Sequence, residues 1–181
     1  MSSRSSALGP VGLCAVHCLG LFGASRVVAI EPEEARREMA LTLGADAALA
    51  PGDDPAAAVL AATDGREPDV VIECAGHPAT LRAAVELVRP GGRIAVIGNP
   101  GSHEALPLID LFNKAVTYTG GLARLDCLPE LVALIDAGRL DLRPMITHRF
   151  ALADIVDGFE LFEARGDGVI KVAVSVGGTA A

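Results

Sequence analysis

Gly9 and Gly12 open an apolar segment, and their spacing lets the backbone there approach a negatively charged ligand. They match the second and third glycines of the pattern G-x-G-x-x-G, whose first position is Ala7 in this chain. In that pattern the second glycine lets backbone amides approach a pyrophosphate, the third lets a helix pack closely on a strand, and the helix N-terminus supplies positive potential. We therefore predict a phosphate-binding turn made of Gly9, Pro10, Val11 and Gly12.

A carboxylate follows this turn at a spacing that indicates which nucleotide binds. Glu31 directly follows the strand-like run RVVAI and lies 22 residues after Gly9. An acid at this place accepts hydrogen bonds from adenosine ribose hydroxyls and repels a 2′-phosphate, which favours NAD over NADP. Arg36, about one helical turn further on, is either an adenosine contact or a solvated helix charge. Ordinary helix-entry glycines are the alternative interpretation of the whole pattern.

Short apolar runs alternate with segments of helical period, which is typical of βαβ units around a parallel sheet. The runs at 27–30, 70–72 and 94–97 are apolar at nearly every position, as in strands covered on both faces. We predict an α/β fold with a Rossmann-like doubly wound parallel sheet. The strand-like run VTYT at 116–119 is followed by Gly120 and Gly121, after which helical segments take over. This predicts a nucleotide-binding domain over 1–121 and a C-terminal segment over 122–181.

Two helices are the most clearly patterned. Between Pro78 and Val88, apolar residues recur at i, i+3, i+4 and i+7, and Pro90-Gly91-Gly92 then turns the chain into the next strand. An earlier helix is predicted from Pro32, with acids in its first turn, to a stop at Gly44. Its buried stripe is expected to start with Ala35 and Met39. Similar spacings predict helices at 128–135 and 152–159, before a last strand at 169–176.

Three blocks of the chain carry a resemblance to a known family. They are LGPVGLCAVHCLGLFGASRVVAIEPEEARREMALTLGADAAL, DVVIECAGHPATLRAAVELVRPGGRIAVIGNPG and MITHRFALADIVDGFELFEARGDGVIKVAV. In this order and spacing they resemble the second half of a medium-chain, zinc-type alcohol dehydrogenase, over residues 7 to 176. The resemblance implies an oxidoreductase that binds NAD at the switch point of the sheet.

The resemblance also implies roles for particular residues. Ile97, Gly98 and Asn99, together with Cys74, would line the nicotinamide side of the cofactor. Lys171 falls where such enzymes direct a basic residue at the cofactor phosphates, and a surface lysine on a strand is the alternative. Subunits would pair through the edge strand at 116–120 into a homo-oligomer.

Two departures from the family limit what this chain is expected to do alone. Ser3-Arg4-Ser5-Ser6 stands where the family has its hydrophobic central strand, so we expect that strand to be degraded or missing and the fold to be marginally stable. In the family that the chain resembles, the zinc ligands and the substrate pocket belong to an N-terminal catalytic half, which we expect to be absent here. We therefore predict no catalytic residue and no metal ligand here.

Other candidates for chemistry receive structural interpretations. Cys14, His17 and Cys18 share one helix face, which rarely completes tetrahedral zinc coordination, so core packing is preferred. Glu73 ends a strand beside the predicted cofactor crevice and either orients backbone groups there or is purely structural.

Composition excludes other classes of partner. With 15 Lys+Arg against 23 Asp+Glu, the net charge is −8, which repels nucleic acid. The longest apolar runs are far shorter than the roughly 20 residues of a membrane span. The four cysteines form no CxxC and are expected to be reduced, so we predict a soluble, cytoplasmic protein.

These observations predict the cofactor-binding portion of an NAD-dependent alcohol or polyol dehydrogenase. Its reaction would be hydride transfer between an alcohol and NAD, with a small alcohol as substrate only when the missing domain is supplied. One alternative is a non-catalytic binding or assembly protein that kept the fold. A methyltransferase using S-adenosylmethionine shares the glycine turn and the acid, but the endings IKV and EARGDG argue against it.

Overall fold

The computed structural model describes residues 8–99, 106–122 and 125–177. The chain divides into two compact units, Met1–Glu130 and Leu131–Ala181. The domain boundary expected at residue 121 stays a prediction.

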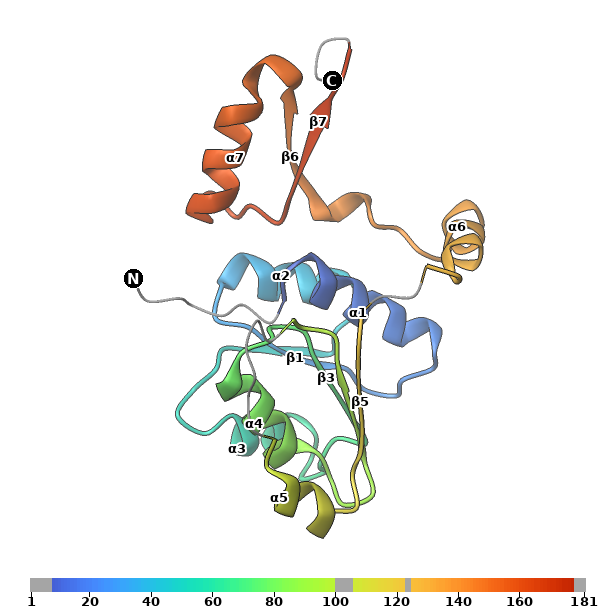
Figure 1. Ribbon diagram of the computed structural model, residues 1–181, viewed down its shortest axis with the longest axis vertical. Coiled ribbons are helices and arrows are strands. Elements are labelled where there is room, and N and C mark those ends of the chain that lie inside the picture. The colour runs from blue at the N-terminus through green and yellow to red at the C-terminus, as the bar shows by residue number, and fades with distance from the viewer. Residues whose placement is uncertain (1–7, 100–105, 123–124, 178–181) are drawn as a thin grey trace. The chain divides into compact units, whose positions relative to one another are not determined.

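The first unit alternates helices and strands along its whole length, as the sequence pattern predicts. Its elements in chain order are α1 Pro10–Leu21, β1 Val28–Ile30, α2 Glu34–Thr42, β2 Ala47–Leu49, α3 Pro55–Ala62, β3 Val70–Glu73, α4 Pro78–Leu87, β4 Arg93–Val96, α5 Leu108–Asn113 and β5 Thr117–Gly120. The helices form two groups, α1 beside α2 and α3 beside α4 with α5 nearby (Figure 1). Two helix groups around parallel strands confirm the predicted α/β class.

The strands form two parallel patches. β1 pairs with β2, whereas β4 lies between β3 and β5, and every pair is parallel. Within residues 8–99 and 106–122, the strands do not join into one continuous sheet. The predicted edge position of β5 is confirmed for its patch. The polar segment expected to weaken the central strand, residues 3–6, lies outside the described residues.

The polar segment at residues 3–6 is the reason to expect a marginally stable fold, since its side chains supply little of the apolar burial that a central strand normally contributes. We expect thermal unfolding of the purified chain within the usual mesophile range. A cooperative transition above about 65 °C, followed by circular dichroism, would contradict this expectation.

One hydrophobic cluster of the first unit is built around α4, whose predicted stripe is confirmed. Leu81, Ala84 and Val85 are buried on one face of the helix. They pack with Val88, which is the C-cap residue of α4 and the last residue of the predicted stripe, and with buried residues of the neighbouring elements, namely Ile94, Val96 and Leu111. Burial of this stripe follows from the 3.6-residue period, which places i, i+3 and i+4 on the same face.

The stripe predicted for the helix after Pro32 is wrong by one position. Ala35 is exposed, whereas Arg36 and Ala40 are the buried residues of α2. The helix begins only at Glu34, and α2 lies against β1, β2 and α1, which together select the covered face. Because each residue turns the helix by about 100°, a shift of one position moves a side chain onto a different face. Arg36 is therefore not the solvated helix charge that was one of its two interpretations.

The C-terminal end of α4 is held by a lysine from outside the helix. The ammonium of Lys114 donates to the carbonyl oxygens of Val85 at 2.9 Å, Glu86 at 2.8 Å and Val88 at 2.9 Å. These carbonyls belong to the last turn of the helix, where a cation also interacts favourably with the helix dipole. Lys114 thus satisfies a set of acceptors that the helix itself leaves open.

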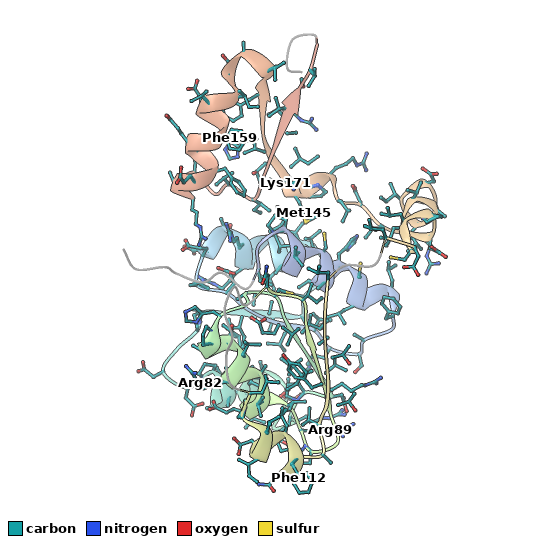
Figure 2. The ribbon with its side chains drawn as sticks, in the orientation of Figure 1. Arg82, Arg89, Phe112, Met145, Phe159 and Lys171 are labelled. Carbon is teal, nitrogen blue, oxygen red and sulfur yellow. The ribbon has the colours of Figure 1, made fainter. Side chains whose placement is uncertain are left out.

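Replacing Lys114 by methionine is expected to lower the free energy of unfolding by about 2 kcal/mol, since charged hydrogen bonds to helix-terminal carbonyls are lost. Urea denaturation measures the change. Arg82 is an exposed cation on the same helix (Figure 2), so Arg82→Met is the matched control, expected within about 0.5 kcal/mol of the parent chain. Equal losses for both variants would contradict this role of Lys114.

The second unit is a small parallel pair of strands with one helix. After α6 Leu128–Asp136, which spans the division between the units, the elements are η1 Arg143–Met145, β6 Ile146–Ala151, η2 Leu152–Asp154, α7 Ile155–Ala164 and β7 Lys171–Ser175. β6 and β7 are parallel, and α7 packs against both (Figure 1). Gly158 makes this contact close, because an added Cβ would lie 3.2 Å from the ring of Phe150.

Both helices near the C-terminus carry apolar side chains that are not covered. On α7, Val156 is 62% exposed, and Phe159, which is labelled in Figure 2, is 68% exposed. On α6, Leu128 is 50% exposed and Val132 is 53% exposed. Both predicted helices form, but the apolar side chains that predicted them are exposed and do not make a buried face. Across residues 8–99, 106–122 and 125–177, the structure has no helix with the length and apolar character needed to cross a bilayer.

Candidate nucleotide-binding site

The predicted glycine turn lies at the start of α1. Gly9 is the N-cap residue with extended backbone, and its carbonyl accepts the first helical hydrogen bond from the Leu13 amide at 3.0 Å. Pro10 occupies the first turn, where its fixed φ suits the helix. Among the residues that the structure describes, a Cβ added to Gly9 would meet nothing within 4 Å, whereas Gly12 is buried.

Glu31 faces this turn directly. Its side chain is fully buried, and its carboxylate accepts hydrogen bonds from the Leu8 amide at 2.6 Å and from the Glu33 amide at 3.0 Å. The two amides bind different carboxylate oxygens, Oε2 and Oε1 respectively. A carboxylate accepts up to about four hydrogen bonds, so it can join a backbone turn and a ligand hydroxyl at once. The acid and the glycine turn predicted from their spacing are thus brought together.

A second buried carboxylate organises the loop after β3. Glu73 is 4% exposed and accepts hydrogen bonds from the Ala75 amide at 2.8 Å, the Gly76 amide at 2.9 Å and the Thr80 hydroxyl at 2.7 Å. Its backbone carbonyl accepts from the Ile97 amide at 2.8 Å and the Gly98 amide at 3.0 Å. Glu73 therefore contacts both the loop that follows β3 and the loop that follows β4.

These two loops meet through glycines. A Cβ added to Gly98 would overlap the Gly76 nitrogen and lie 2.8 Å from the Ala75 nitrogen. A Cβ added to Gly76, where φ is +66°, would overlap the carbonyl oxygen of Asn99. The backbones approach so closely that no side chain fits between them. Beyond this contact, Ile97 is 44% exposed and Asn99 is exposed, so residues predicted for the nicotinamide side lie at the accessible end of the loop.

Cys74 directly follows β3 and precedes the two amides that bind the Glu73 carboxylate. Burial, together with the nearby Glu73 carboxylate and the Cys14 thiol, raises the pKa of Cys74 to about 11. A pKa this high keeps the thiol protonated near neutral pH.

We expect the Cys74 thiol to resist alkylation at about pH 8, since a pKa near 11 leaves only about one thiolate in a thousand. Raising the pH from about 8 to about 10 is expected to speed its reaction roughly a hundredfold. Cys127 is exposed and provides the internal comparison in the same chain. Peptide mapping by mass spectrometry after iodoacetamide treatment measures the alkylation rates of Cys74 and Cys127. Similar rates for the two thiols at about pH 8 would contradict the raised pKa of Cys74.

Two predicted cofactor contacts have different surroundings. Arg36 is 9% exposed on α2 and lies in the same unit as Glu31. Lys171 is exposed at the first position of β7, opposite Ile146 in the strand register, and belongs to the second unit. The roles predicted for both residues at the cofactor stay predictions.

The described residues do not provide a zinc site. Among residues 8–99, 106–122 and 125–177, no three His, Cys, Asp or Glu side chains are grouped to hold a metal ion. Of the helical set considered above, His17 has its Nδ1 3.1 Å from the Leu43 carbonyl oxygen, and burial raises the pKa of Cys18. A raised pKa disfavours the thiolate that zinc requires. No chemical step of this chain is therefore derived through zinc.

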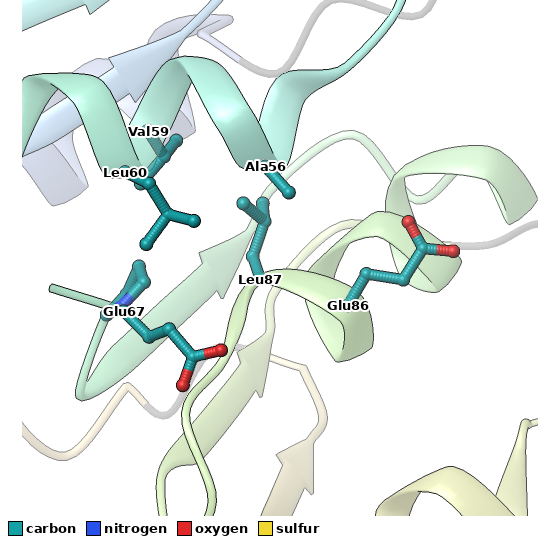
Figure 3. A pocket seen from close by; sticks show the side chains of 7 residues that line it. Ala56, Val59, Leu60, Glu67, Glu86 and Leu87 are labelled. Atoms are coloured by element: carbon teal, nitrogen blue, oxygen red, sulfur yellow. The ribbon is translucent and has the colours of Figure 1, made fainter. Parts of the chain in front are cut away.

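A small hollow lies away from this region. It is bordered by α3 and α4 and lined by Ala56, Val59, Leu60, Glu67, Pro68, Glu86 and Leu87 (Figure 3). Glu67 and Pro68 precede β3, whereas Glu73 ends it. The hollow is thus at the amino end of β3, opposite the carboxyl edge where ligands bind in open parallel sheets.

Comparisons with known proteins agree with this geometry. A family model described as zinc-binding dehydrogenase matches residues 10–137. The chain belongs to this family. An alcohol dehydrogenase of Cupriavidus necator is 34% identical over 176 residues, covering 93% of this chain and 47% of that protein. An L-threonine 3-dehydrogenase of Bacillus licheniformis is 34% identical over 157 residues, covering 84% of this chain and 45% of that protein.

Solved structures of similar proteins share the fold. An alcohol dehydrogenase from Thermus sp. ATN1 has a TM-score of 0.85 at 33% identity, covering 94% of this chain and 49% of that one. A short chain alcohol dehydrogenase from E. coli CFT073, solved as a complex with NADH, has a TM-score of 0.85 at 26% identity, covering 93% of this chain and 50% of that one. The predicted family and Rossmann-like fold are confirmed. The chain spans about half the length of the curated relatives it matches.

Proposed function

We propose that this chain binds NAD and forms the cofactor-binding portion of an NAD-dependent alcohol or polyol dehydrogenase. The observation that carries the proposal is the pair of hydrogen bonds that join the buried Glu31 carboxylate to the amides of Leu8 and Glu33 beside the glycine turn. A turn that admits a pyrophosphate and an acid that binds ribose hydroxyls define an adenine dinucleotide site.

Each part of the site has a physical task in this proposal. The turn of Gly9, Pro10, Val11 and Gly12 brings backbone amides and the positive end of α1 to the pyrophosphate. Glu31 accepts hydrogen bonds from the adenosine ribose. Because Glu31 is fully buried, a bound ribose must displace or share the groups that now cover the carboxylate. Such displacement weakens binding to this chain alone.

The nicotinamide end of the cofactor is assigned to the loops after β3 and β4. Cys74, Ile97, Gly98 and Asn99 would surround it, and Arg36 and Lys171 would contact the adenosine and the phosphates respectively. NAD, when bound, accepts a hydride from the carbon of an alcohol. The residues of this chain bind and orient the cofactor, and none of them is assigned a catalytic role.

We place the substrate pocket and the family's zinc ligands in the part of the relatives that this chain does not match. The chain alone is then expected to bind NAD without oxidising a small alcohol. The exposed apolar residues of α6 and α7 support this proposal, because the rest of a dehydrogenase would cover such a surface. We further propose a soluble, cytoplasmic homo-oligomer paired through residues 116–120, with neither nucleic acid nor membrane as a partner.

Calorimetric titration tests the proposal. We expect the purified chain to bind NAD, to bind NADP more weakly, and not to bind S-adenosylmethionine. We also expect no reduction of NAD with simple alcohols. Binding of S-adenosylmethionine in preference to NAD would replace the proposed function with that of a methyltransferase. If NAD does not bind at all, the dinucleotide site is refuted for this chain.

A further inference from the structure

Glu73 is, with Glu31, one of the two buried carboxylates among the described residues. Its side chain is 4% exposed and receives three backbone or hydroxyl donors from the loop and helix that follow β3, those of Ala75, Gly76 and Thr80. The Gly76 amide lies within hydrogen-bond distance of both carboxylate oxygens, at 2.9 Å and 3.1 Å. A carboxylate bonded in this way fixes the backbone around it, because turning any one amide away leaves a buried charge partly unpaired.

The fixed loop is in turn the surface against which the next loop lies. Gly76 contacts Gly98 and Asn99 backbone to backbone, with no room for a Cβ at either glycine. The Glu73 carbonyl also accepts from the Ile97 and Gly98 amides. The position of residues 97–99 therefore depends on the position of residues 75–76, which the Glu73 side chain holds. The donors that bind the Glu73 carboxylate, those of Ala75, Gly76 and Thr80, belong to the loop and helix after β3, so the carboxylate acts on residues 97–99 through that loop.

We propose that Glu73 is the positioning residue for the nicotinamide half of the cofactor site. It acts through the backbone of residues 75–76 on the backbone groups of residues 97–99, which would meet the nicotinamide ring and its carboxamide. This inference rests on the proposed function. It deepens that function by dividing the cofactor site into two halves, each held in place by a different buried carboxylate. The adenosine half depends on Glu31, in the patch of β1 and β2, and the nicotinamide half depends on Glu73, in the patch of β3 and β4.

Two ligands distinguish these halves. NAD contains both, whereas ADP-ribose contains the adenosine, the pyrophosphate and the second ribose but lacks the nicotinamide. Glu73→Gln keeps the size of the side chain but places an NH2 donor opposite backbone N–H donors. We expect this variant to weaken NAD binding about tenfold and ADP-ribose binding less than about twofold, measured by calorimetry on the full chain.

Hydrogen exchange supplies a readout that requires no ligand. In Glu73→Gln we expect faster amide exchange at residues 75–76 and also at residues 97–99, with unchanged exchange at residues 28–31. Glu86→Gln changes an exposed acid on α4 and is the matched control for both measurements. Thr80→Val removes a single donor to the carboxylate and is a milder second variant, expected to shift both measurements in the same direction.

The outcomes separate this inference from the proposed function. Equal loss of NAD and ADP-ribose affinity in Glu73→Gln would reduce Glu73 to a general structural role and overturn the inference. If the parent chain binds neither ligand, the proposed function fails and the cofactor role of Glu73 fails with it. If the parent chain binds NAD, loosening of both loops in Glu73→Gln supports the inference, whereas unchanged protection of residues 97–99 overturns it. Should Glu73→Gln fail to fold, Thr80→Val decides by the same comparisons.

Discussion

Alanine in place of Gly98 is expected to lower the free energy of unfolding by about 3 kcal/mol or more, because overpacking against backbone cannot be relieved by a rotamer change. The added Cβ would overlap the Gly76 nitrogen and lie 2.8 Å from both the nitrogen and the carbonyl carbon of Ala75. To admit the methyl group, the loops after β3 and β4 must separate. Separation weakens the Glu73 carbonyl bonds to Ile97 and Gly98 as well.

Guanidinium denaturation followed by circular dichroism measures this loss, and Gly52→Ala is the control. A Cβ at Gly52 would meet nothing within 4 Å, and its φ lies outside the left-handed region. We therefore expect a change of less than about 0.5 kcal/mol in the control. A Gly98→Ala chain as stable as Gly52→Ala would show that the two loops do not pack as described.

Alanine in place of Glu31 is expected to affect stability and cofactor binding together. The amides of Leu8 and Glu33 lose a fully buried acceptor, which lowers the free energy of unfolding by about 2 to 4 kcal/mol. The ribose hydroxyls lose the same acceptor, so the Kd for NAD is expected to rise by about tenfold to a hundredfold. Urea denaturation and calorimetry measure the two effects separately.

Two further variants test whether the losses of stability and NAD affinity come from the Glu31 carboxylate itself. Glu34→Ala removes an exposed acid from the first turn of α2 and is expected to leave NAD affinity within about twofold of the parent chain. Glu31→Gln keeps the side-chain volume but removes the charge, so it is expected to narrow the difference between NAD and NADP affinity. Unchanged discrimination in Glu31→Gln would mean that this carboxylate does not face the adenosine ribose.

The sequence alone predicted the helices and turns that have clear apolar periodicity or turn-forming Pro and Gly residues. The helix from Pro78 follows from its apolar spacing, and Pro90-Gly91-Gly92 correctly marks the turn before β4. Weaker signals were missed. β2 Ala47–Leu49 and α3 Pro55–Ala62 consist largely of alanine, whose small side chain gives little contrast between a buried face and an exposed one. For α3, the N-cap Asp54, which accepts from the Ala57 amide, was the signal that could have revealed it.

Burial depended on neighbours that are distant in the sequence. Arg36 is covered and Ala35 is exposed because α2 lies against β1, β2 and α1, and no property of the helix alone selects that face. The apolar spacing of α6 and α7 predicts helices but not coverage, since Val132 and Phe159 are accessible in this chain. Periodicity indicates which residues share a face, whereas packing decides what covers that face.

The sequence by itself determined the family, the α/β class and the pairing of a glycine turn with an acid, because each depends on residue types at fixed spacings. Only the tertiary structure showed that Glu31 binds the Leu8 amide, that Glu73 holds the loop after β3, and that Gly76 meets the backbone of residues 98–99. The physical reason is that hydrogen bonds and backbone contacts between distant residues depend on how the chain folds back on itself, which a local pattern does not specify.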